Sequence, residues 1–209
     1  MDDLTDRNQF LNIAALFEGS LVIGAFFLGW LVDLNPTASW QWSMLALVWG
    51  IAGAVPMFVL FLIAHYFAVG PFRSIRKFLI DTLGPSLDAC RWYDLILLSL
   101  LAGVTEELLF RGVLQPWLEQ WGTAFGLTVS NILFGLAHAI TPLYAVLAGL
   151  SGAYLGWLFD ASGERNLLTP VVTHTVYDYL AFVVVLRTYR LEMSGDDDPE
   201  PSPDDAADD

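Results

Sequence analysis

A group of charged residues interrupts an apolar stretch in the middle of the chain. Residues 105–112 read TEELLFRG, and apolar sequence precedes and follows them. Glu107 and Arg111 are four residues apart, so on a helix they share one face and form an ion pair. Glu106 points about 100° away from Glu107 around the helix axis and has no partner in its own helix. An ion pair that serves packing explains two of these residues and leaves Glu106 as a candidate for chemistry.

Two later apolar stretches also carry polar residues at helical spacing. Residues 134–138 read FGLAH and residues 174–178 read HTVYD, so His174 and Asp178 share one helix face. Each histidine alone is compatible with a hydrogen-bonded residue of the protein interior. Together with the unpaired Glu106 on an earlier helix, His138, His174 and Asp178 predict one polar site on which three helices converge.

The chemistry that such a set of groups can perform is hydrolysis. Glu106 would accept a proton from a water molecule that His138 also holds, and His174 would donate to a developing oxyanion. A divalent metal such as zinc is the alternative, because two histidines and a carboxylate form a known catalytic ligand set. Its candidate ligands are Glu106, His138, His174 and Asp178. The chain has no H-E-x-x-H motif, so the spacing alone indicates zinc only weakly.

The composition is that of a membrane protein. Of the 209 residues, 56% are hydrophobic and 15% are charged, whereas soluble domains carry about 25% charged residues. A helix that crosses a bilayer needs about 20 mostly apolar residues. About six stretches qualify: residues 10–32, 42–67, 93–114, 122–139, 143–159 and 167–186. The predicted fold is therefore all-α, a polytopic integral membrane bundle of about six transmembrane helices, in one domain over residues 1–194.

Basic residues predict the orientation of this bundle. They lie between the second and third stretches and after the sixth: Arg73, Arg76, Lys77, Arg91, Arg187 and Arg190. The positive-inside rule then places both termini in the cytoplasm, with the protein in the cell membrane and the lipid bilayer as a partner. Eight of the acids behind the net charge of −14 lie in residues 195–209, which we expect to be a disordered tail. The chain offers no basic surface for a nucleic acid.

The three motifs resemble those of a known family. EELLFR, FGLAH and HTVYD, in this order on successive helices, are similar to the motifs E-E-x-x-x-R, F-x-x-x-H and H-x-x-x-N or D of the CAAX protease and bacteriocin-processing family of intramembrane proteases. The resemblance covers about residues 95–183. It implies a peptidase that hydrolyses membrane-associated peptides or protein tails. Glu106 and His138 would activate water, Glu107 and Arg111 would support them, and His174 and Asp178 would line the site. Metal dependence stays open.

One residue departs from the pattern of the prenyl-protein proteases in that family, which have Asn where this chain has Asp178. Asn donates a hydrogen bond, whereas ionised Asp only accepts. Asp178 would therefore repel an oxyanion unless it were protonated, or it would orient His174 or bind a metal. The departure weakens the transfer of the prenyl-cysteine substrate to this chain.

Two other functions fit a polar site in a membrane bundle. A catalytically silent membrane scaffold or bacteriocin-immunity protein would use the same fold, but the intact motifs argue against it. A proton-coupled transporter also uses intramembrane Glu and His residues, but the chain lacks the inverted repeats that would support transport.

The positions of the motifs along the helices set a condition on the fold. His138 falls near one end of stretch 122–139, whereas Glu106 falls past the middle of stretch 93–114. The two meet only if stretch 122–139 is short, offset or tilted, with residues 139–142 non-helical and lining protein or a water-filled cavity. Glu18 and His65 are two further polar residues in apolar stretches, for which we expect structural hydrogen bonds.

Overall fold

The computed structural model describes residues 2–161 and 163–196, and its architecture is all-α, as predicted. The longer helices are α1 (Asp2–Leu31), α2 (Met44–Tyr66), α3 (Pro71–Asp88), α4 (Trp92–Leu109), α6 (Thr123–Ala137), α7 (Pro142–Leu158) and α8 (Leu168–Asp196). After α4 the chain stays helical through a π-helical turn (Phe110–Leu114), the short α5 (Gln115–Leu118) and a 3-10 turn (Glu119–Trp121). The predicted acidic tail lies outside the described residues, apart from the last two residues of α8.

Within the described part of the chain, three helices are long and apolar enough to cross a membrane: Arg7–Leu31, Met44–Tyr66 and Leu168–Ser194. They correspond to the first, second and sixth predicted stretches. The fourth and fifth stretches are the shorter apolar helices α6 and α7. The third stretch is α4 with its continuation, where Asp94, Glu106 and Glu107 lower the apolar character of an otherwise suitable helix. The protein is therefore an integral membrane helix bundle in which only part of the helices have full spanning length.

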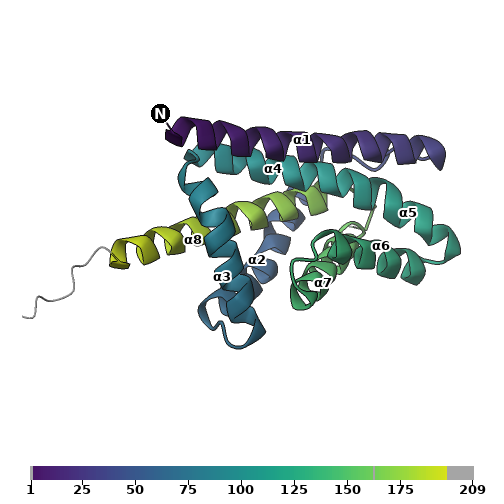
Figure 1. The fold of residues 1–209 in the computed structure, drawn as a ribbon. Coiled ribbons are helices and arrows are strands. Elements are labelled where there is room, and N and C mark those ends of the chain that lie inside the picture. The colour runs from purple at the N-terminus through teal and green to yellow at the C-terminus, as the bar shows by residue number, and fades with distance from the viewer. Residues whose placement is uncertain (1, 162, 197–209) are drawn as a thin grey trace, which may run out of the picture.

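Helix α8 lies at the centre of the bundle. It packs against α2, α3, α4 and α7, while α1 packs along α4 (Figure 1). The contact between α4 and α8 is close because Gly103 has no side chain: a Cβ there would collide with Thr175 of α8. Small residues at a helix contact let two backbones approach in this way. As a result α4 and α8, which carry two of the three motifs, are held side by side.

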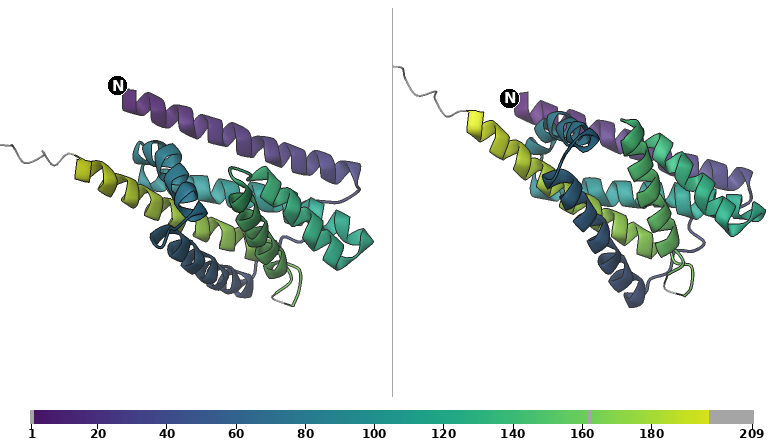
Figure 2. Two further views of the ribbon diagram at one scale, coloured as in Figure 1. Left: turned by 60° about the horizontal axis from the view of Figure 1, so that its bottom comes forward. Right: turned by 90° about the horizontal axis from the view of Figure 1, so that it is seen from below.

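Helix α3 is an element that the sequence analysis did not predict. It begins with Pro71 at its first position, where a missing N–H costs nothing. Its buried face carries Ile75, Ile80 and Leu87. In Figure 1, and in both views of Figure 2, α3 runs transverse to α1, near the end where α1 begins.

The chain is non-helical between α6 and α7, as the predicted convergence requires. Helix α6 ends at Ala137 and α7 begins at Pro142. The side chain of Thr141 caps α7 by accepting a hydrogen bond from the backbone N–H of Tyr144 at 3.1 Å. This break ends α6 at His138, so the histidine lies at a helix end.

Candidate active site

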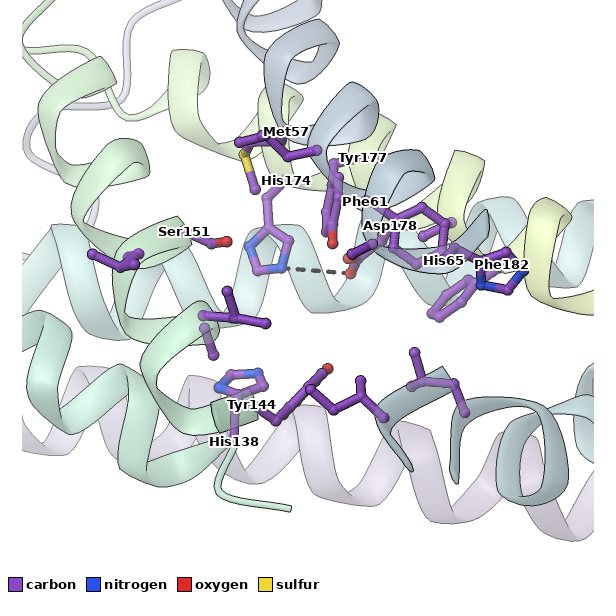
Figure 3. Close-up of a pocket in the computed structure, with 18 of the residues that line it drawn as sticks. Met57, Phe61, His65, His138, Tyr144, Ser151, His174, Tyr177, Asp178 and Phe182 are labelled. Atoms are coloured by element: carbon purple, nitrogen blue, oxygen red, sulfur yellow. Dashed lines mark ion pairs between the residues drawn. The ribbon is translucent and has the colours of Figure 1, made fainter. Parts of the chain in front are cut away.

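Residues from all three motifs line one cavity of about 670 Å³. Its walls come from α1, α2, α3, α4, α6, α7 and α8, and most of the side chains are apolar, such as Met57, Phe61 and Phe182. Glu106, His138, His174 and Asp178 lie together on this cavity (Figure 3 shows the last three). The cavity therefore brings the polar groups of three separate helices into one largely apolar compartment.

Glu106 lies between the two histidines. Its Oε2 is 3.6 Å from Nε2 of His138 and 4.0 Å from Nε2 of His174. Both distances are too long for direct hydrogen bonds, and this buried oxygen has no hydrogen-bond partner among the residues that the structure describes. A buried carboxylate oxygen without a partner is unusual and calls for an explanation.

The tautomer of each histidine follows from the partner of its Nδ1 atom. Nδ1 of His138 lies 2.9 Å from the carbonyl oxygen of Phe134, and a carbonyl only accepts, so Nδ1 donates. Nδ1 of His174 lies 2.9 Å from Oε1 of Glu107 and donates to that carboxylate. In neutral rings, Nε2 of both histidines then carries a lone pair on the side that faces Glu106.

Arg111 is fully enclosed, with 1% of its surface exposed. Its Nη1 donates to Oε1 of Glu107 at 3.0 Å, so the ion pair that the spacing predicts is present. Its Nη2 donates to Oδ1 of Asn131 at 2.9 Å and to the carbonyl oxygen of Gly152. The guanidinium also lies 4.9 Å from the centroid of the Phe134 ring. Arg111 thus ties α4 to both α6 and α7.

Asn131 and Gly152 are partners of Arg111 that were not predicted from the sequence. Asn131 precedes His138 by seven residues, which places it two helical turns earlier on the same helix face. This spacing could have identified Asn131 as a residue near the site. Gly152 supplies only a backbone carbonyl. A Cβ there would lie 2.6 Å from Oδ1 of Asn131 and 3.2 Å from Nη2 of Arg111, so glycine leaves room for the contact.

Asp178 also faces the cavity. Its Oδ2 lies 3.4 Å from Nε2 of His174, the ion pair drawn as a dashed line in Figure 3. Tyr144, Tyr177 and Ser151 line the same compartment, and the sequence analysis did not single them out. In Figure 3 the hydroxyl groups of Tyr144 and Tyr177 lie on the cavity side of their helices, near His138 and Asp178 respectively.

The two remaining polar residues make the structural hydrogen bonds that we expected. The hydroxyl of Thr105 donates to Oε2 of Glu18. Nε2 of His65 lies 2.9 Å from Oγ1 of Thr188. Both Glu18 and His65 line the cavity as well.

The four candidate metal ligands share the cavity, but their arrangement does not form a recognisable metal centre. Within residues 2–161 and 163–196, no group of three or more His, Cys, Asp or Glu side chains is placed to hold a metal ion. The divalent metal therefore stays a prediction.

Comparison with known proteins agrees with the motifs. Residues 88–180 match the model of the family described as "Type II CAAX prenyl endopeptidase Rce1-like", which confirms the resemblance predicted for about residues 95–183. No curated protein and no solved structure matches the chain. The matched segment contains both glutamates, Arg111, both site histidines and Asp178. Residues 88–180, a little under half of this membrane protein, are therefore similar to the type II CAAX prenyl endopeptidases.

Proposed function

We propose that the protein is an endopeptidase that hydrolyses membrane-associated peptides or protein tails with a water molecule activated by Glu106 and His138. The observation that carries this proposal is the buried, unpartnered Oε2 of Glu106, which faces Nε2 of His138 at 3.6 Å and Nε2 of His174 at 4.0 Å. A water molecule bound at this point would donate one hydrogen to the carboxylate and the other to His138.

The first chemical step is the attack of this water on the peptide carbonyl carbon. As the new C–O bond forms, the proton leaves the water for Oε2 of Glu106. The hydrogen bond from Nδ1 of His138 to the Phe134 carbonyl keeps Nε2 of His138 as the acceptor that orients the water. The carbonyl π electrons move to the oxygen, which becomes an oxyanion.

The second step is the collapse of the tetrahedral intermediate. The C–N bond breaks, and the leaving nitrogen takes the proton that Glu106 holds, giving a carboxylic acid and an amine. His174 stabilises the oxyanion by donating from Nε2. Because Nδ1 already donates to Glu107, this role requires the imidazolium form, and the carboxylate of Asp178 at 3.4 Å compensates its charge.

Glu107 and Arg111 support these groups without contacting the substrate. Glu107 fixes the ring of His174, and Arg111 fixes Glu107 through their 3.0 Å contact. Arg111 in turn is anchored by Asn131 and Gly152. This chain of contacts spans α4, α6, α7 and α8, so it preserves the geometry of the reacting groups.

The test is peptide cleavage by the full-length protein reconstituted in nanodiscs. Two internally quenched peptides with the same cysteine-containing C-terminal tail would be compared, one with a farnesyl group on the cysteine and one without. We expect cleavage within the tail, located by mass spectrometry, and its loss in Glu106→Gln. The pair of peptides also shows whether the prenyl group is needed despite the Asp178 departure.

A second measurement covers substrates that these peptides do not represent. Membranes from cells that produce the wild type and Glu106→Gln would be compared by quantitative analysis of peptide termini. We expect new termini that depend on Glu106. If neither peptide is cleaved and the two membranes carry identical termini, the peptidase proposal is wrong.

A further inference from the structure

Three hydroxyl groups that face the cavity have no partner in the protein. They belong to Tyr144 and Ser151 on α7 and to Tyr177 on α8. Within residues 2–161 and 163–196, none of these hydroxyl groups forms a hydrogen bond. All three residues are half-buried, and a hydroxyl group in largely apolar surroundings is unfavourable unless it is hydrogen-bonded. Each of these groups is therefore available to a molecule that enters the cavity.

Tyr144 lies in the first turn of α7, directly after the break that ends α6. Its backbone N–H donates to the side chain of Thr141, which caps α7, at 3.1 Å, and His138 is the C-cap residue of α6. The connection that places His138 at a helix end thus also fixes the backbone of Tyr144. In Figure 3 the side chain of Tyr144 points into the cavity from the wall opposite His174. His138 and Tyr144 therefore face the same compartment.

The two tyrosines of the cavity differ in the carboxylates that surround them. The charges of Asp178 and Glu106 both act on the hydroxyl group of Tyr144. For Tyr177, Asp178 is the one carboxylate among the described side chains that acts in this way, and Figure 3 shows the Tyr177 hydroxyl group near Asp178. Of the two, Tyr144 is thus the tyrosine that lies toward Glu106, where the water would be activated.

The charged groups of the site supply few hydrogen-bond donors for an oxyanion. An oxyanion is stabilised by donors that point at it, whereas the carboxylates of Glu106, Glu107 and Asp178 only accept when they are ionised. His174 can offer one N–H, on Nε2, because its Nδ1 already donates to Glu107. This Nε2 also lies 3.4 Å from Oδ2 of Asp178, so the carboxylate competes with the oxyanion for it. A second, uncharged donor would complete the oxyanion site.

We propose that the hydroxyl group of Tyr144 is this second donor, and that Tyr144 is a catalytic residue that stabilises the oxyanion together with His174. This role rests on the proposed peptidase function. The hydroxyl group keeps its proton throughout: it donates to the substrate oxygen while that oxygen is negative, and the hydrogen bond weakens when the C–N bond breaks and the carbonyl re-forms. Because the bond is strongest in the transition state, its loss should lower kcat and change KM little.

The test is the removal of single hydroxyl groups from the full-length protein in nanodiscs, assayed with a peptide that the wild type cleaves. Loss of one oxyanion donor lowers kcat by about 10²–10³-fold, so we expect a fall of that size in Tyr144→Phe. Its thermal unfolding should match the wild type, because the hydroxyl group has no partner among the described residues. The matched control is Tyr66→Phe, at a residue that is 64% exposed and does not line the cavity. It should keep the kcat and KM of the wild type.

Inhibition by a phosphinic peptide gives a readout that does not depend on turnover. Its phosphinate group carries negative oxygen at tetrahedral geometry in place of the scissile amide, so it resembles the intermediate, and such analogues bind more tightly than substrates. The inhibition constant should rise in Tyr144→Phe much more than KM does. It should stay unchanged in Tyr66→Phe.

Three results would overturn the role of Tyr144 and leave the peptidase function standing, since each requires a wild type that cleaves. The first is an unchanged kcat in Tyr144→Phe. The second is a rise in KM alone, which would make the hydroxyl group a contact to the bound substrate. The third is a loss of kcat in Tyr177→Phe that Tyr144→Phe does not show. If the wild type cleaves no peptide and produces no new termini in membranes, the proposed function is wrong and the role of Tyr144 is wrong with it.

Discussion

Nδ1 of His174 lies 2.9 Å from Oε1 of Glu107, although 67 residues separate them in the chain. The same oxygen accepts the hydrogen bond from Nη1 of Arg111 at 3.0 Å. Glu107 is therefore more than the partner of an intrahelical ion pair, because it also fixes a ring on α8. The two adjacent glutamates therefore differ in what they face: Oε1 of Glu107 accepts both hydrogen bonds, whereas Oε2 of Glu106 faces Nε2 of His138 and of His174 at 3.6 and 4.0 Å. Oε2 of each glutamate is buried without a hydrogen-bond partner among the described residues.

Replacing Glu106 by Gln should abolish most of the activity and leave the fold intact. The amide is nearly isosteric but cannot accept the proton of the attacking water. General base catalysis contributes about 10²–10⁴-fold, so we expect turnover of the quenched peptides to fall by that factor. Thermal unfolding in detergent should change little. Turnover near that of the wild type would exclude Glu106 as the base.

The control for this variant is Asp33→Asn. It is the same carboxyl-to-amide change outside the cavity. Asp33 has a φ of 57°, a left-handed conformation that Asn also tolerates. Activity and thermal stability of Asp33→Asn should both match the wild type.

Glu107 and Arg111 should be coupled in stability. Both side chains are almost completely buried, and removing one partner of such a pair costs about 3–5 kcal/mol because the other charge is stranded. We expect Glu107→Gln, Arg111→Met and the double variant to lose less in combination than the sum of the single losses. Thermal unfolding in detergent measures this, and strictly additive losses would show that the pair is not coupled.

The charge of Asp178 should matter for activity. In the proposed mechanism it compensates the imidazolium form of His174, whose Nε2 lies 3.4 Å away. Asp178→Asn should therefore lower the turnover strongly, although the prenyl-protein proteases have Asn at this position. Full activity of Asp178→Asn between about pH 6 and 9 would show that Asp178 acts as a neutral donor, since an amide also donates.

A chelator separates the two charged roles of Asp178. If the carboxylate orients His174, treatment with a chelator leaves the wild-type turnover unchanged. If it helps to hold a metal, activity is lost and returns with added zinc, because metal ligands release the ion and rebind it. The mechanism proposed here leads us to expect no effect of chelation, and a zinc-reversible loss would replace it.

The end of the bundle that carries α3 should face the cytoplasm. A cysteine introduced at Ser74 on α3 and one at Glu164 before α8 should react with a membrane-impermeant maleimide from opposite sides. Both positions are exposed. Labelling of intact cells should modify only the Glu164→Cys protein. Modification of both from one side would refute the predicted topology.

The native cysteine gives little background in this experiment. Cys90 is 8% exposed, and burial raises the pKa of its thiol to about 11. The thiolate is the reactive form, so Cys90 should label slowly at neutral pH. The unmodified protein, treated in parallel, measures the remaining background.

The sequence predicted the all-α membrane bundle and the ion pair between Glu107 and Arg111, because both follow from spacing along one helix. It also predicted that Glu106 and His138 meet only if stretch 122–139 is short, offset or tilted, with residues 139–142 non-helical; in the structure α6 ends at Ala137 and α7 begins at Pro142. The structure brings these residues together. Their catalytic roles stay predictions until the variants are measured.

Other features depend on contacts that spacing does not encode. The carbonyl of Gly152 has no side-chain signature, and the shared oxygen of Glu107 joins helices that are distant in sequence. Helix α3 was missed for another reason. Its apolar residues have helical spacing, but Gly70 and Pro71 before it and Gly84 and Pro85 within it are typical of turns. Burial of Ile75, Ile80 and Leu87 against the bundle outweighs that local preference.

The π-helical turn at Phe110–Leu114 sets the rotational phase between the two halves of a long helical segment. There the N–H of Gln115 donates to the carbonyl of Phe110, five residues earlier. Such a turn is equivalent to one residue inserted into an α-helix. Deleting a residue there would turn the segment beyond it by about 100° relative to Glu107. Glu119 would then rotate away from Arg165, which it contacts at 2.7 Å. This one turn therefore fixes the rotation of the far end of the bundle relative to the site.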